Sequence, residues 1–198
     1  MIQRPLTLRT LALPLMLAMS SLTAHASTDT ALLAAAEKAQ PELIESLRQM
    51  VLIESGSADV KGLAQMAQLL ESRLKTLGFT TERVKTTTGA GADIVLGKLQ
   101  GSGRAKIMLQ AHMDTVYSSG ILSTQGYKVD GNRIYGPGIA DDKGGIAVIL
   151  HGLALLQQRG WKDFAQLTVM FNPDEEVGSI GSGELISQLA DQHDVVLS

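Results

Sequence analysis

The sequence of 198 residues contains no cysteine, and it has only three tyrosines, three phenylalanines and one tryptophan. No disulfide can therefore form, and any metal site must be built from His, Asp and Glu side chains. Seventeen Lys and Arg stand against 20 Asp and Glu, giving a formal net charge of −3. No basic stripe is present, so nucleic acid is disfavoured as a partner.

Two catalytic signatures are also missing. No G-x-S-x-G motif surrounds a serine, and no G-x-x-x-x-G-K loop occurs. These absences argue against a serine hydrolase of the nucleophile-elbow type and against a P-loop nucleotide-binding protein.

The first 26 residues differ from the rest of the chain. Two arginines precede an apolar stretch from Leu11 to Leu22, and the small-residue sequence Ala24-His25-Ala26 follows it. The stretch is interrupted by a proline and is too short to span a bilayer core of roughly 30 Å comfortably. We therefore expect residues 1–26 to be a signal peptide. Its removal on export to the periplasm or the medium would leave residues 27–198 without a membrane segment.

Hydrophobic periodicity after residue 27 predicts a single α/β domain. Apolar residues at helical spacing predict helices over residues 28–54, with a break at Pro41, and over residues 60–77, 143–159 and 184–190. Short apolar runs bounded by turn residues predict strands at residues 79–84, 94–99, 106–110, 167–171 and 194–197.

Three of the apolar runs end in clusters of acidic or imidazole side chains. The clusters are His112-Met113-Asp114, Asp141-Asp142 and Glu175-Glu176. Strand ends in an open α/β sheet face a common crevice, so clusters far apart in sequence can meet there. Carboxylates and imidazole are ligands of divalent metals, and the pattern is typical of a two-metal hydrolase.

Each cluster taken alone has a simpler interpretation. A lone histidine after a strand is more often structural, although Asp114 would share a face with His112 and could fix its tautomer. Asp141 and Asp142 suit helix capping as well as metal bridging. Consecutive acids around Glu175 suit a solvated turn as well as a cation site.

Together the motifs resemble a known family. The strings QAHMDTVY, YGPGIADDKGG and FNPDEEVGSIGS are similar to the zinc-dependent aminoacylase, acetylornithine deacetylase and glutamate carboxypeptidase family, and within it to the exported bacterial glutamate carboxypeptidases that hydrolyse folates. The resemblance implies a three-layer α/β/α zinc-peptidase-like catalytic domain. Residues 27–198 would be its truncated N-terminal portion.

The resemblance also implies the site residues. His112 would bind one zinc ion, Asp141 would bridge two, and Glu176 would bind the other; other divalent cations are possible occupants. Asp114 and Glu175 would be the catalytic residues, Asp114 by orienting His112 and Glu175 as general base. The peptide bond after the bridging aspartate would be cis. No substrate-binding residue is predicted.

The implied reaction is hydrolysis of an amide that joins an acyl or aminoacyl group to a C-terminal amino acid, with glutamate favoured. The substrate would be a small N-acyl or peptidyl amino acid. Complete family members form homodimers through a smaller domain that is missing here, and they supply further metal ligands after residue 198. The alternative is an inactive exported fragment that at most binds metal weakly.

Overall fold

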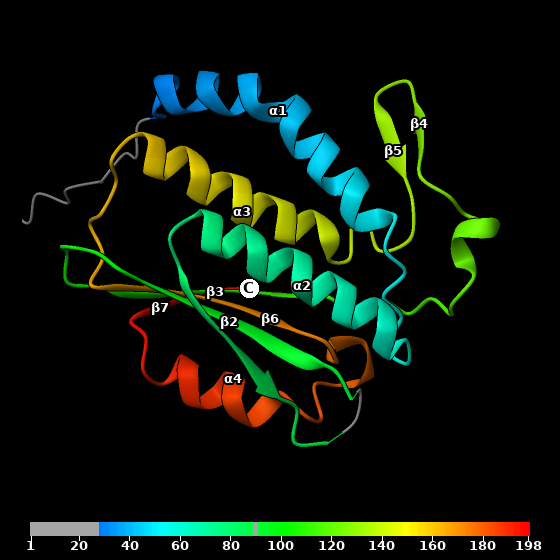
Figure 1. Ribbon diagram of the computed structural model, residues 1–198. Helices are drawn as coiled ribbons and strands as arrows, with labels where there is room; N and C mark the ends of the chain where they lie inside the picture. Colours follow the sequence, from blue (N-terminus) through cyan, green and yellow to red (C-terminus); the bar gives the residue numbers. More distant parts are fainter. Residues whose placement is uncertain (1–27, 89–90) are drawn as a thin grey trace, which may run out of the picture.

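The computed structural model describes residues 28–88 and 91–198 (Figure 1). The predicted signal peptide lies outside these residues. The helices are α1 (Thr30–Val51), α2 (Val60–Thr76), α3 (Lys143–Gln158) and α4 (Gly183–Ala190). The strands are β1 (Thr80–Lys85), β2 (Asp93–Gln100), β3 (Lys106–His112), β4 (Lys128–Asp130), β5 (Arg133–Tyr135), β6 (Gln166–Asn172) and β7 (Val195–Leu197). Two short 3-10 helices, η1 (Ile121–Ser123) and η2 (Glu175–Val177), complete the set.

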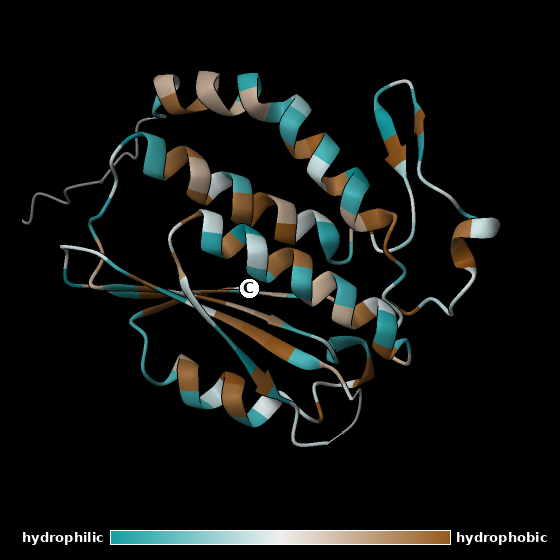
Figure 2. Cartoon of the chain, in the orientation of Figure 1, coloured by the Kyte–Doolittle hydropathy of each residue, from teal (hydrophilic) through white to brown (hydrophobic). Residues whose placement is uncertain are grey.

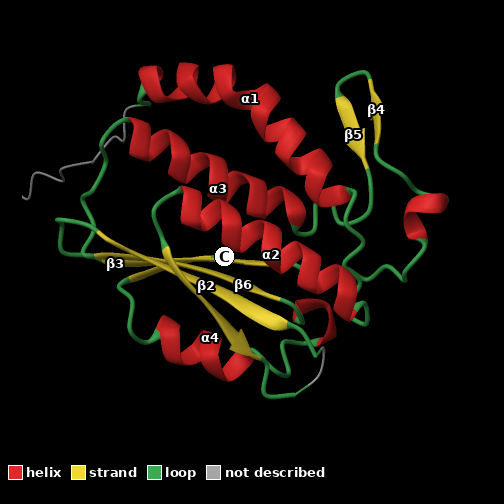
Figure 3. Ribbon diagram, in the orientation of Figure 1, coloured by secondary structure: helices red, strands yellow, loops and turns green. Residues whose placement is uncertain are grey.

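Five of the strands form one sheet in the order β1-β2-β6-β3-β7. Helices α1, α2 and α3 cover one face of this sheet and α4 covers the other, so the chain has three layers (Figures 1 and 3). The predicted α/β/α architecture is therefore confirmed. The β4–β5 hairpin stands apart as a separate two-stranded sheet.

The predicted break at Pro41 is wrong. Helix α1 runs without interruption through Pro41 and ends at Val51. Proline removes only one backbone donor, and the surrounding turns keep their own hydrogen bonds, so the helix changes direction along its length instead of ending (Figure 1). The remaining helices and strands of the main sheet fall close to their predicted ranges. The β4–β5 hairpin was not predicted, because its strands have three residues each.

The hydrophobic core lies mainly between the sheet and helices α1 to α3. Helix α2 is amphipathic, as its sequence predicts, and its apolar face is fully buried, whereas Leu77 just beyond it is only partly buried. A smaller cluster joins the opposite face of the sheet to α4 through Ile94, Met108 and Leu189. Figure 2 shows hydrophobic segments along the strands between these helix layers.

The pairing of β3 with β6 positions the site. These strands are parallel, and their register places His112 opposite Asn172. The backbone continues this alignment beyond the strands, since the amide of Met113 donates to the Asn172 carbonyl at 2.8 Å. Residues that follow β3 and β6 therefore emerge side by side at one edge of the sheet.

No helix within residues 28–88 and 91–198 is both long enough and apolar enough to cross a membrane.

The core makes a prediction about α2. Leu74 is fully buried whereas Leu33 on α1 is 50% exposed. We expect Leu74→Ala to lower the free energy of unfolding by about 2–5 kcal/mol, because the deletion leaves a cavity. Leu33→Ala is the matched control and should change it by less than about 0.5 kcal/mol. Urea unfolding followed by circular dichroism measures both; equal effects would contradict the packing described.

Candidate metal centre

His112 is the last residue of β3 and is only 7% exposed. Its two ring nitrogens point to different partners. Nε2 lies 2.9 Å from Oδ1 of Asp141, and Nδ1 lies 3.1 Å from the backbone carbonyl of Asp114 and 3.3 Å from its Oδ1. Nδ1–H as the donor to Asp114 leaves the Nε2 lone pair for a cation, which is the arrangement that the sequence predicted for an oriented ligand.

Asp114 is completely buried, and its carboxylate organises the turn after β6. Oδ1 accepts a hydrogen bond from the backbone amide of Glu175 at 3.0 Å, and Oδ2 accepts one from that of Glu176 at 3.0 Å. Oδ2 also accepts from the Ser57 hydroxyl at 2.8 Å. Asp114 therefore positions His112 and both glutamates at once, whereas the sequence indicated only the contact with His112.

Asp141 and Asp142 lie between a Gly/Pro loop and α3. The peptide bond between them is cis, as the resemblance implied. Asp142 is the N-cap residue of α3, but its side chain makes no capping hydrogen bond. The side chain of Asp141 is 75% exposed and reaches His112. The Asp142 carboxylate accepts a hydrogen bond from the backbone amide of His112 at 3.4 Å.

Three of the predicted site residues come together. One donor atom each from His112, Asp141 and Glu176 lies within 4.8 Å of the other two. One imidazole and two carboxylates are a suitable donor set for zinc or another divalent cation. Glu175 lies beside the set, with Oε2 3.8 Å from Nε2 of His112. Asp114 stays outside the set, as expected for a residue that supports a ligand.

The electrostatics of the cluster favour a cation. Burial lowers the pKa of His112, but the hydrogen bonds to Asp114 and Asp141 outweigh it and raise that pKa to about 9. Burial raises the pKa of Glu176, and the neighbouring charge of Asp141 raises it further. Without a metal ion, a proton on His112 supplies positive charge to the cluster. A bound metal ion would displace that proton and supply positive charge in its place.

The acidic run after β6 divides into two roles. Asp174 is completely buried and accepts hydrogen bonds from the backbone amides of Gly181 and Ser182 and from the Ser182 hydroxyl. It therefore holds the loop that follows η2. Only Glu175 and Glu176 face the cluster, so neither a fully solvated turn nor a wholly metal-binding run describes this segment.

Sequence reasoning missed Lys143. Its side chain is 1% exposed, and Nζ donates to the Ile53 carbonyl at 2.8 Å, which ties the start of α3 to the segment after α1. Burial lowers the pKa of Lys143 to about 8, although the charge of Glu54 opposes the shift. The sequence analysis assigned Lys143 no role beyond the start of a helix, and no signal in the sequence indicated its burial.

Comparison with known proteins agrees with this geometry. Residues 108–197 match the model of peptidase family M20/M25/M40. The chain is 48% identical over 170 residues to carboxypeptidase G2 of Pseudomonas sp. (strain RS-16), covering 86% of this chain and 41% of the relative. It is 31% identical over 149 residues to acetylornithine deacetylase of Erwinia tasmaniensis, covering 72% and 38%. The chain thus spans about two fifths of the length of these relatives.

Solved structures show the same fold. An M20 family metallo-carboxypeptidase from Sulfolobus solfataricus matches with a TM-score of 0.68 and 20% identity, covering 79% of this chain and 36% of that one. Human carnosine dipeptidase 1 matches with a TM-score of 0.70 and 18% identity, covering 83% and 39%.

The raised pKa of His112 predicts how stability depends on pH in the metal-free protein. The folded state binds the proton more tightly than the unfolded state, whose ordinary value is 6.5. The stabilisation is therefore complete below pH 6.5 and is lost as the pH rises through about 9, amounting to at most about 3 kcal/mol. Urea unfolding in a chelator at pH 6 to 9 should show this loss.

The matched variant is His112→Gln, which cannot bind this proton. Lys143 contributes with the opposite sign because its pKa is lowered, and it does so in both proteins. The difference between wild type and variant therefore isolates His112. Parallel pH profiles for the two proteins would refute the assignment.

Proposed function

Because the chain belongs, over residues 108–197, to peptidase family M20/M25/M40, we propose that it is the N-terminal part of a dizinc catalytic domain and that the protein is a metal-dependent hydrolase. It cleaves the amide bond between an acyl or aminoacyl group and a C-terminal amino acid, with glutamate favoured. The observation that carries the proposal is the convergence of His112, Asp141 and Glu176, with Glu175 beside them.

His112 and Asp141 hold one metal ion in this proposal, and Asp141 and Glu176 hold the other. Two bound divalent cations would polarise the scissile carbonyl and lower the pKa of a water molecule. The carboxylate of Asp141 is suited to bridging, since its side chain is 75% exposed while its Oδ1 lies 2.9 Å from Nε2 of His112. The number of ions, their identity as zinc and the homodimer implied by the resemblance remain predictions.

Glu175 acts as the general base. Its carboxylate removes a proton from the attacking water, whose oxygen forms a bond to the carbonyl carbon. The C–N bond then breaks as Glu175 returns the proton to the leaving nitrogen, which gives a carboxylic acid and an amine. The remaining proton of the acid passes to the amine or to solvent, leaving a carboxylate. The backbone of Glu175 is held by Asp114, while its side chain is half exposed and lies 3.8 Å from Nε2 of His112.

Metal binding without turnover is the second candidate. The observation that favours it is the small donor set. The residues that the structure describes supply three donor residues, so each ion of a bridged pair would have only two, with Asp141 shared by both ions. Catalytic zinc sites normally have three protein ligands per ion. Measuring metal content and hydrolysis on the same sample separates the two candidates.

Glu175→Gln is the direct test of the mechanism. It should lower kcat for an N-acyl glutamate by about 10²–10⁴-fold, because the base is lost, while the bound metal measured by atomic absorption stays unchanged. Glu176→Gln is the matched control, and it should lose metal as well as activity. Loss of metal in Glu175→Gln would reassign Glu175 as a ligand.

Export is proposed from residues 1–26. Expression of the full chain in a bacterium should yield a periplasmic protein that begins at Ser27, because the Ala24-His25-Ala26 sequence suits signal peptidase. Mass spectrometry of the periplasmic fraction gives the new N-terminus. Full-length protein recovered from the cytoplasm alone would exclude this localisation.

A further inference from the structure

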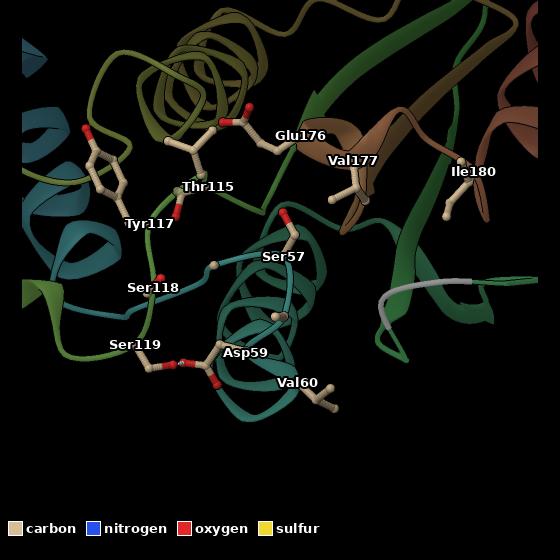
Figure 4. A pocket seen from close by; sticks show the side chains of 13 residues that line it. Ser57, Asp59, Val60, Thr115, Tyr117, Ser118, Ser119, Glu176, Val177 and Ile180 are labelled. Carbon is tan, nitrogen blue, oxygen red and sulfur yellow. Dashed lines mark hydrogen bonds between the residues drawn. The ribbon is translucent and has the colours of Figure 1, made fainter.

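A groove of about 1000 Å³ lies directly beside Glu176 (Figure 4). Its walls come from the loop before α2, from the segment that follows Asp114 and from η2 with the residues after it. Glu176 belongs both to the groove and to the cluster of potential metal ligands. A molecule with its reacting bond at that cluster would therefore extend into the groove.

The groove gathers exposed aliphatic side chains. Val60, Val116, Val177 and Ile180 all line it, and they are 48%, 70%, 47% and 62% exposed. In Figure 4, Val177 and Ile180 lie along one side, and Tyr117 lies along the opposite side. Single exposed aliphatic residues need no explanation, but four of them line this one hollow together with the hydroxyl groups of Ser57, Thr115, Tyr117, Ser118 and Ser119. A hollow that combines apolar side chains with a few polar groups has the usual composition of a ligand site.

The charge of the groove limits what can bind. None of the thirteen lining residues is basic, and the acidic ones are Asp59 and Glu176. Asp59 is already engaged, because its Oδ1 accepts from the backbone amide of Gly62 and its Oδ2 accepts from the Ser119 hydroxyl (Figure 4). A carboxylate placed in the groove would meet like charge and no cationic partner. These charges disfavour the groove as the place of a substrate's terminal carboxylate.

The groove is also held in shape by backbone contacts. The amide of Ser57 donates to the Thr115 carbonyl at 3.2 Å, and the amide of Thr115 donates to the Ser55 carbonyl at 2.9 Å. The hydroxyl of Ser57 is fixed by Asp114. A preformed wall loses little conformational freedom on binding, so apolar contacts made there contribute to affinity.

We propose that this groove binds the acyl half of the substrate, and that the preferred acyl group is an uncharged apolar chain. The proposal rests on the hydrolase function proposed above, since it takes the cluster as the place where the amide is cleaved. It assigns the selection of the acyl group to Val60, Val116, Val177 and Ile180.

Hydrolysis of matched substrates is the first test. N-acetyl, N-hexanoyl and N-(6-aminohexanoyl) glutamate are compared by kcat/KM, the last two having acyl chains of equal length without and with a terminal ammonium. The hexanoyl substrate should exceed the acetyl one by about tenfold or more. A preference for the aminohexanoyl substrate, or equal values for acetyl and hexanoyl, would overturn the proposal.

Two exposed valines provide the variant and its control. Val116 lines the groove, whereas Val129 on β4 is 56% exposed and lies outside it. Val116→Ser should lower the hexanoyl-to-acetyl ratio of kcat/KM by roughly threefold to tenfold, as expected for losing two methyl groups from an apolar contact. Val129→Ser should leave the ratio unchanged. The same ratio in both variants would count against the groove.

A binding measurement separates this proposal from the proposed function. The Glu175→Gln protein, loaded with zinc and carrying ¹³C-labelled methyl groups, is titrated with N-hexanoyl glutamate and followed by NMR. The methyl signals of Val116 and Ile180 should shift on saturation, while those of Val129 should not. Shifts in the groove with no hydrolysis by the wild type would refute only the hydrolase function. If the signals of Val116 and Ile180 do not shift, the groove does not bind the acyl group, whether or not the wild type hydrolyses the substrate.

Discussion

The buried carboxylate of Asp114 is the interaction on which the site depends. It is completely inaccessible to solvent, and it receives hydrogen bonds from the Ser57 hydroxyl and from the amides of Glu175 and Glu176, with Nδ1 of His112 3.3 Å from Oδ1. A buried charge is stable only when such partners surround it. Because those partners come from three separate segments, satisfying this one carboxylate brings the loop before α2, the end of β3 and η2 to the same place.

The sheet makes that convergence possible. Parallel pairing of β3 with β6 sets the ends of both strands at one edge, and the register of His112 with Asn172 fixes their separation. The side chain of Asp174 then holds the loop beyond η2, and Lys143 holds the start of α3. Asp174 and Lys143 are themselves buried by these contacts. Asp141 and Glu175 are exposed and Glu176 is partly buried, so these three carboxylates stay accessible.

The sequence predicted the parts of the molecule that depend on local patterns. Hydrophobic periodicity placed the main helices and strands. The acidic and imidazole clusters indicated a possible metal site, and the family resemblance selected His112, Asp141 and Glu176 within them, although Asp141 lies in a turn before α3 and not at a strand end. Ser57 and Lys143 could not be predicted, because a serine in a polar loop and a lysine after two aspartates usually lie in solvent. Their roles arise from pairing between segments distant in sequence. The predicted helix break at Pro41 was wrong because a proline removes only one backbone donor, and the helix continues through it to the buried residues Leu47, Met50 and Val51.

Under the proposed function, charge would also orient a substrate at this site. The metal-free cluster is crowded with acids, and a cation bound there would reverse the sign of the local field, so an anionic amino acid end would be drawn towards the cluster. The groove beside Glu176 offers no such reversal, because no basic residue lines it and its other acid, Asp59, is hydrogen-bonded to the start of α2. In the binding mode that we propose, an amide substrate with one apolar end and one anionic end would have a single favourable direction. Its apolar end would lie along Val116 and Ile180, and its scissile bond would lie over His112, Asp141 and Glu176.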